Sequence, residues 1–168
     1  MEHILVIDPG YRNFAAARLE GCAVKQVWCV DLVPMFDRQP TEQELMKATW
    51  TWLQQEGLTL MDFDMILIEQ QHERYLAVQV GFLCGLFGVD VCRVVHRGRV
   101  NNLLAGSYLR DSKYADRKKW AVMATDLLFS KDDLLKDESI TPADCANHNI
   151  CDCLVMAYAY LHHRQKVF

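Results

Sequence analysis

Three carboxylates stand at places in the sequence that core packing alone does not explain. Asp8 directly follows an apolar run and precedes Pro9-Gly10, and Glu69 ends a second apolar run. Asp152 lies within a mostly apolar stretch near the C-terminus. A buried carboxylate is costly unless it is paired or bound to a metal. The three acids are therefore candidates for one shared site.

A cluster of carboxylate oxygens suits Mg²⁺ or Mn²⁺, which take hard ligands and keep coordination positions for water and phosphate. Two such ions would activate a water molecule and stabilise the departing oxygen in phosphodiester cleavage. The ordinary alternatives are a turn-forming role for Asp8 and a salt-bridged strand end for Glu69. A shared metal site explains the acids together, which the separate roles do not. We therefore predict Asp8, Glu69 and Asp152 as catalytic metal ligands for two ions.

Two polar residues near Asp152 are candidates for a fourth ligand or for a group that supports the ligands. His148 and Asn149 stand four and three residues before Asp152 and would share its face on a continuous helix. We predict His148 as the fourth catalytic and metal-binding residue, with Asn149 as the alternative. Asp144 is a further candidate, although the pattern 141–144 explains it as a helix-capping residue.

Basic residues concentrate in one part of an acidic chain. The whole chain has a formal net charge of -4, but residues 93–119 hold eight Lys and Arg against two Asp, which leaves about -10 elsewhere. This segregation indicates either a solvated charged face or a surface that binds a polyanion. Lys118 and Lys119 open a predicted helix, where cations oppose the helix dipole. Contact with a phosphate or with an attacking water is the alternative to simple solvation.

Hydrogen-bonding, cationic and aromatic groups directly follow Glu69, beside the expected site, where they are suited to contacts with nucleic acid. Together with the basic segment they give the set of predicted DNA-contacting residues: Gln70, Gln71, His72, Arg74, Arg97, Arg99, Arg110, Lys113 and Lys118.

Length and composition indicate one ordinary globular domain spanning residues 1–168. The chain is 51% apolar and 24% charged, without an apolar run long enough to cross a membrane. Seven irregularly spaced cysteines favour free thiols in a reducing compartment. Because residues 3–7 already have the pattern of a core strand, we expect no signal or transit peptide. A soluble intracellular protein, including a viral protein within a host cell, fits these features.

Periodicity predicts an α/β fold. The predicted strands are 3–8, 13–19, 23–32, 64–69 and 89–95. The predicted helices are 41–55, 76–87, 99–104 and 118–129, with a closing helix from 141 to about 164 that has a break near Asn147. The apolar helix 76–87 is expected to be buried. We predict a mixed five-stranded sheet, antiparallel first and parallel afterwards, with helices on both faces. If the first and fourth strands are neighbours, Asp8 and Glu69 meet at one edge of the sheet.

Two motifs at strand ends resemble those of a known enzyme family. Residues 7–10 (Ile-Asp-Pro-Gly) with Asn13 resemble the first-strand motif of the RuvC-like Holliday junction resolvases, members of the RNase H-like superfamily. Residues 68–71 (Ile-Glu-Gln-Gln) with Arg74 resemble that family's second acidic motif. The resemblance makes Asp8 and Glu69 the first two catalytic acids.

The resemblance extends over nearly the whole chain and is greatest to the poxvirus and fungal-mitochondrial branch. Residues 81–106 are similar to the family's buried helix, core strand and basic helix. Residues 117–122 resemble its basic motif, in which Lys119 would be the active-site lysine. Residues 152–157 are similar to the terminal helix with the last metal-binding acid. Many relatives place a further Asp or a His one turn earlier, and no Asp stands there in this chain.

The resemblance implies an RNase H-like fold and a Mg²⁺- or Mn²⁺-dependent homodimer that resolves four-way DNA junctions by symmetric nicking of opposed strands. Such an enzyme processes recombination and replication intermediates. A related nuclease acting on RNA–DNA hybrids or flaps is one alternative. A catalytically silent junction-binding module is another, because of the missing Asp.

Overall fold

The fold is built on a mixed six-stranded sheet. The structure is a computed structural model that describes residues 1–33, 38–105, 114–131, 133–138 and 140–167. Its strand order is β5-β4-β1-β2-β3-β6. The strands are β1 (His3–Asp8), β2 (Phe14–Glu20), β3 (Ala23–Val30), β4 (Met65–Glu69), β5 (Cys92–Val95) and β6 (Leu135–Lys136). The first three strands pair antiparallel, whereas β1, β4 and β5 run parallel.

The predicted α/β class and the antiparallel-then-parallel order are confirmed. The five predicted strands are found, with β5 beginning three residues later than expected. The sixth strand, β6, pairs with β3 and corrects the predicted strand number. It has two residues, which is too short to show an alternating pattern in a sequence.

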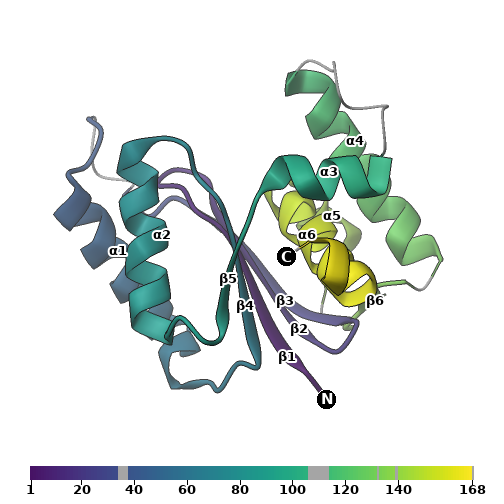
Figure 1. Ribbon diagram of the computed structural model, residues 1–168, viewed down its shortest axis with the longest axis horizontal. Coiled ribbons are helices and arrows are strands. Elements are labelled where there is room, and N and C mark those ends of the chain that lie inside the picture. Colours follow the sequence, from purple (N-terminus) through teal and green to yellow (C-terminus); the bar gives the residue numbers. More distant parts are fainter. Residues whose placement is uncertain (34–37, 106–113, 132, 139, 168) are drawn as a thin grey trace.

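Helices cover both faces of this sheet. Helices α1 and α2 lie on one face, and α3 to α6 lie on the other (Figure 1). The helical elements are α1 (Glu42–Gln55), the 3-10 turn η1 (Leu58–Leu60), α2 (Arg74–Phe87), α3 (Arg97–Ala105), α4 (Tyr114–Ser130), α5 (Pro142–Cys145) and α6 (His148–Val167). Within the described part of the chain, no helix is both long enough and apolar enough to span a membrane.

Side-chain alternation along the strands divides the core into two layers. In β1, Leu5 and Ile7 join the cluster beneath α1 and α2. Ile4 and Val6 face the other way and join the cluster that includes the buried side of α6. The two faces of one strand therefore serve two separate cores, and even-numbered residues of β1 point toward α6.

Capping residues and a helix break lie where the sequence predicted them. Thr41 forms the expected capping box with Glu44 at the start of α1. Thr141 forms a second one with Asp144 at the start of α5. The predicted break near Asn147 is confirmed, because α5 ends at Cys145 and α6 begins at His148.

Helix α2 is less buried than its composition suggests. Its fully buried residues are Gln79, Val80 and Leu83, so the expectation of a buried helix holds for one side only. The opposite side exposes Ala77, Gly81 and Gly85 at a spacing of four residues. The apolar composition had suggested burial all round, but the monomer covers only the side that packs on the sheet.

Candidate active site

Strand register brings Asp8 and Glu69 together. Ile7 of β1 pairs with Ile68 of β4, so the next residue of each strand is an acid at the same edge of the sheet. Alternation turns both acids toward the face that α6 covers. Helix α6 packs across β1, and it carries Asp152 on its buried side with 2% of the residue exposed. The predicted convergence of the three acids is the geometry that the fold produces.

A guanidinium group lies between two of these acids. Arg97, the first residue of α3, donates from Nη1 to Glu69 Oε2 at 3.2 Å and from Nη2 to Asp152 Oδ1. It reaches the acids because α3 follows β5, and β5 is the parallel neighbour of β4. The sequence predicted Arg97 as a phosphate contact and did not reveal these partners.

Lys118 approaches Asp152 from the other side. Its Nζ lies 3.3 Å from Asp152 Oδ2 and 3.1 Å from Asn149 Oδ1. Lys119, which the resemblance assigned as the active-site lysine, is exposed on α4. Helix α4 begins at Tyr114, so neither lysine stands at the helix start as predicted. The lysine that contacts an acid of the cluster is Lys118.

His148 and Asn149, the two candidates that precede Asp152, differ in burial and in contacts. Asn149 is buried and contacts Lys118, whereas the side chain of His148 is exposed in the first turn of α6. Partial burial lowers the pKa of His148 and the charge of Lys118 lowers it further, which favours the neutral imidazole. The carboxylate of Asp144 caps α5, and hydrogen bonds from Thr141 lower its pKa.

The cluster carries an excess of negative charge. Burial raises the pKa of Asp8 well above its ordinary value, and the charges of Glu69 and Asp152 raise it further. Burial also raises the pKa of Glu69, against the opposing effect of Arg97. For Arg97 itself, burial acts to lower the pKa, but the hydrogen bond to Asp152 and the surrounding acids raise it. Added positive charge would therefore be bound favourably at Asp8 and Glu69.

Asp8→Asn is expected to raise the melting temperature of the metal-free protein at pH 7. The folded state holds the Asp8 proton more tightly than the unfolded chain, where the pKa is near 3.8. Stability is therefore lost as the pH rises from about 4 through the raised pKa, and the neutral amide avoids this loss. Each kcal/mol corresponds to about 2–4 °C in a chain of this size.

The check is a set of thermal melts in EDTA from pH 4 to 8, with the exposed Asp126→Asn as the control. The difference between Asp8→Asn and the wild type should shrink as the pH falls toward 4. A wild type that is the more stable of the two at pH 7 would contradict this electrostatic description of Asp8.

Two glutamines support the turn that carries Asp8. Gln71 donates to Asp8 Oδ1 at 3.3 Å, from the segment that follows β4. Gln79, buried in α2, donates to the Gly10 carbonyl at 3.3 Å and to Thr49 Oγ1 at 2.9 Å. Sequence reasoning missed Gln79 as a supporting residue. The signal was present, because Gln79 interrupts an otherwise apolar helix.

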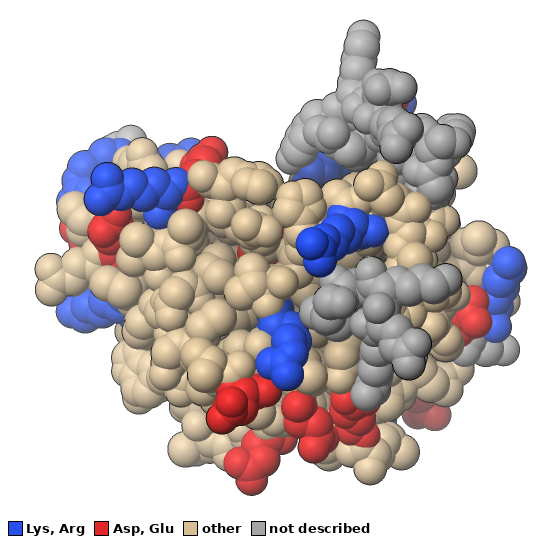
Figure 2. Space-filling view, viewed as in Figure 1, with Lys and Arg blue, Asp and Glu red and all other residues tan. Residues whose placement is uncertain are grey.

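The other predicted DNA contacts fall into two groups. Gln70, His72, Arg74 and Arg99 are exposed and follow β4 or β5 directly, at the end of the sheet that carries the acids. Arg110 and Lys113 lie outside the described residues. Acidic side chains gather along the lower edge of the face in Figure 2.

The carboxylate oxygens of the site are the kind of ligand that a hard divalent cation prefers. Three carboxylates supply oxygen ligands, and burial, followed by the charges of Glu69 and Asp152, raises the pKa of Asp8. As the side chains are placed, the described residues contain no group of three His, Cys, Asp or Glu that would hold an ion. Arg97 lies between Glu69 and Asp152, where it competes with a cation for both acids.

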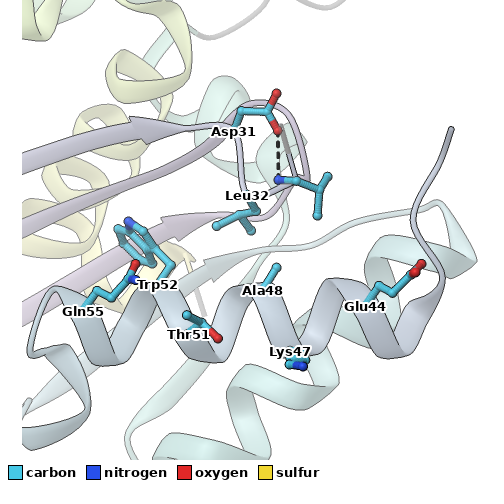
Figure 3. A pocket seen from close by; sticks show the side chains of 9 residues that line it. Asp31, Leu32, Glu44, Lys47, Ala48, Thr51, Trp52 and Gln55 are labelled. Carbon is cyan, nitrogen blue, oxygen red and sulfur yellow. Dashed lines mark hydrogen bonds between the residues drawn. The ribbon is translucent and has the colours of Figure 1, made fainter. Parts of the chain in front are cut away.

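A groove of about 520 Å³ lies apart from these acids, between the end of β3 and α1. Leu32 lies over the face of α1 that carries Ala48 and Trp52, and Asp31 accepts a hydrogen bond from the Val33 backbone (Figure 3). The groove contains none of the predicted site residues. We assign it no role.

Comparison with known proteins finds similarity in structure alone. No family model and no curated protein matches the sequence. RuvC from Thermus thermophilus superposes with a TM-score of 0.56 at 15% identity, over 98% of both chains. The chain has the RNase H-like fold of RuvC.

Two further structures share the RuvC-like fold. Thermus thermophilus RuvC in complex with a Holliday junction substrate gives a TM-score of 0.53 at 16% identity, over 95% of this chain and 94% of that one. The yeast mitochondrial Holliday junction resolvase Ydc2 gives 0.50 at 13% identity, over 98% and 83%. The predicted RNase H-like fold is confirmed by these superpositions.

Proposed function

We propose that this protein is a Mg²⁺- or Mn²⁺-dependent endonuclease that resolves four-way DNA junctions. The observation that carries the proposal is the convergence of Asp8, Glu69 and Asp152 on a RuvC-like sheet, with Lys118 and Arg97 against them. Two of the structural neighbours are a resolvase and a RuvC bound to a junction, which supports the same substrate. The sequence motifs are the basis for proposing a place in the poxvirus and fungal-mitochondrial branch.

Asp8, Glu69 and Asp152 are the residues that would hold a divalent ion. When bound, such an ion would polarise the scissile phosphate and lower the pKa of a bound water molecule. The chain itself contributes preorganised positive charge, because Lys118 is held by Asp152 and Asn149 at a fixed place beside the acids. A cation fixed in this way stabilises the charge that develops on the scissile phosphate without reorganising during the reaction.

The DNA backbone would lie across the same end of the sheet. Arg74 and Arg99 are exposed on the first turns of α2 and α3, the helices that follow β4 and β5. Gln70 and His72 lie between Glu69 and α2, close to the proposed cleavage centre. Phosphate contacts of this kind position the duplex arms and make binding steeply dependent on salt.

We propose a homodimer, which suits a substrate of near two-fold symmetry. The exposed side of α2 supports it, since Ala77, Gly81 and Gly85 would let a second helix approach closely. A Cβ atom built at Gly81 or Gly85 meets nothing within 4 Å among the described atoms. That surface is open in the single chain.

Gly81→Leu is expected to leave the monomer folded and to weaken the dimer by roughly 30-fold or more, as for a buried interface residue. The helix itself should tolerate the change, because Leu favours a helix over Gly by up to about 1 kcal/mol. Light scattering across a dilution series measures it, with the exposed Gln54→Leu of α1 as the control. An unchanged dimer in Gly81→Leu would place the interface elsewhere.

A substrate panel tests the proposed activity against its alternatives. Purified protein is incubated with a four-way DNA junction, a flap, an RNA–DNA hybrid and plain duplex DNA. We expect paired nicks in the junction alone. Cleavage of the hybrid or the flap in preference to the junction would indicate another RNase H-like nuclease. Tight junction binding without nicks in Mg²⁺ or Mn²⁺ would indicate a silent binding module.

A further inference from the structure

One polar side chain is buried in the core beneath α1 and α2. Gln79 of α2 has no exposed surface, and Val80 and Leu83 of the same helix belong to the apolar core around it. Burying an amide costs free energy, and that cost is recovered only where the amide makes hydrogen bonds. The hydrogen bonds of Gln79 therefore indicate why it is there.

Both N–H groups of the Gln79 side chain are used. Nε2 donates to Thr49 Oγ1 at 2.9 Å and to the Gly10 carbonyl at 3.3 Å. Thr49 Oγ1 donates its own hydrogen to the Leu45 carbonyl at 2.8 Å, so toward Gln79 it can only accept. A carbonyl can also only accept, and the amide must therefore turn Nε2 toward both partners. Thr49 thus fixes the orientation in which Gln79 reaches Gly10.

This orientation leaves one polar atom of Gln79 without a partner. Oε1 is buried and accepts no hydrogen bond from the residues that the structure describes. A buried acceptor without a donor destabilises the folded state. A side chain that served packing alone would be apolar at this place, so the contact with Gly10 is the feature that distinguishes Gln79 from an ordinary core residue.

The Gly10 carbonyl belongs to the turn that directly follows Asp8. The turn is closely folded, because a Cβ atom built at Gly10 would lie 3.4 Å from the backbone of Asn13. Asp8 faces the side of the sheet that α6 covers, whereas Gln79 reaches the turn from α2 on the opposite side (Figure 1). The turn is therefore held from the face that does not carry the acids.

Tyr11, the next residue of the turn, is also held by its neighbours. Its carbonyl accepts from the Leu32 N–H at 2.8 Å. Its ring contacts that of Tyr75 edge-on, with the ring centroids 6.0 Å apart. Tyr75 and Gln79 are four residues apart and share one side of α2. One side of α2 therefore contacts two successive residues of the turn.

We propose that Gln79 is a positioning residue for cleavage, acting through the Gly10 carbonyl on the turn that follows Asp8. This inference rests on the proposed nuclease function. Gln79 contacts neither the acids nor the DNA, and its effect is to keep the Asp8 carboxylate in register with Glu69. A displacement of about 1 Å near a reacting group can cost about 10²-fold in rate. Loss of the anchor should therefore slow cleavage more than it weakens the fold.

The test compares variants in which stability and cleavage rate should change differently. Gln79→Met keeps the length of the side chain but removes both hydrogen bonds and the unpartnered oxygen. Its melting temperature should stay within about 4 °C of the wild type, because apolar burial offsets the lost hydrogen bonds. Single-turnover nicking of a four-way junction should be slower by about 10-fold or more. The dissociation constant for the junction in EDTA should be unchanged.

Val80→Ala is the matched control, since it opens the same core at the next residue of α2. It should lower the melting temperature. Below that temperature it should nick at the wild-type rate. Nicking by Gln79→Met at the wild-type rate, or an equal loss of rate in Val80→Ala, would overturn the positioning role.

Thr49 supplies a second pair of variants that decides the question if Gln79→Met does not fold. Thr49→Val removes the acceptor that orients Gln79 and should slow nicking. Thr49→Ser keeps the hydroxyl and should nick at the wild-type rate. Equal rates in the two Thr49 variants would overturn the proposal.

Hydrogen exchange tests the anchor without reference to activity. The main-chain amides of residues 11–13 should exchange faster in Gln79→Met than in the wild type, because the turn has lost one of its contacts. Unchanged exchange would overturn this inference alone. A wild type that nicks no junction would overturn the proposed function, and the exchange rates would still decide whether Gln79 holds the turn.

Discussion

Asp152→Asn is expected to lower junction cleavage by roughly 10²–10³-fold or more, as for the loss of a preorganised electrostatic group in an active site. The substitution keeps the size of the side chain but removes the charge that holds Arg97 and Lys118 beside the other acids. Arg97 then keeps only Glu69 and Lys118 only Asn149 of the partners described above, and the affinity for a divalent ion falls. The measurement is the single-turnover rate of nicking on a four-way junction.

Junction binding should survive this change. Removing a negative charge from a surface that meets phosphates reduces repulsion, so the dissociation constant in EDTA should be unchanged or lower. The matched control is Asp126→Asn, the same substitution at an exposed position of α4. Full cleavage by Asp152→Asn would remove this acid from the mechanism.

Lys118→Ala and Lys119→Ala are expected to show which lysine acts in cleavage, a role that the family resemblance gave to Lys119. Loss of Lys118 removes the cation on Asp152 and Asn149 and should slow cleavage by about 10²-fold with little effect on junction affinity. Loss of Lys119, which is exposed, should leave the single-turnover rate at saturating protein unchanged. Its effect should be a smaller salt dependence of binding, if it meets a phosphate.

Each variant serves as the control for the other, because the residues are adjacent in one helix and chemically identical. Rates at saturating protein and binding at several salt concentrations are measured for both. A large loss of cleavage in Lys119→Ala with normal cleavage in Lys118→Ala would restore the assignment that the family resemblance favours.

The buried side of α4 is the side that carries Lys118. The sequence pattern predicts an apolar side of this helix formed by Ala121, Val122, Ala124 and Leu127. In the structure Thr125 is buried with 1% exposed, and Leu127 is 51% exposed. Lys118 lies on the same side of α4 as the buried Ala121 and Thr125, and it contacts Asp152. A polar residue in a buried position is what an apolar pattern cannot reveal.

The sheet, and the place of Asp8 and Glu69 at one edge of it, could be predicted from the sequence. Each of β1 and β4 is an apolar run that ends in a carboxylate, and parallel neighbours bring such ends to one edge. Arg97 was not predictable in its role, because its partners lie 28 and 55 residues away in the sequence. A basic segment of the sequence shows that positive charge is present, but it does not show which acid each basic side chain contacts.

The most direct test of the central claim is a cleavage assay on a synthetic four-way DNA junction, in Mg²⁺, in Mn²⁺ and in EDTA. The claim is that the cluster of Asp8, Glu69 and Asp152 is the centre that hydrolyses junction DNA. It predicts symmetric nicks in opposed strands that require a divalent ion and vanish in Asp152→Asn. Nicks that persist in EDTA, or equal nicking by the wild type and Asp152→Asn, would contradict it.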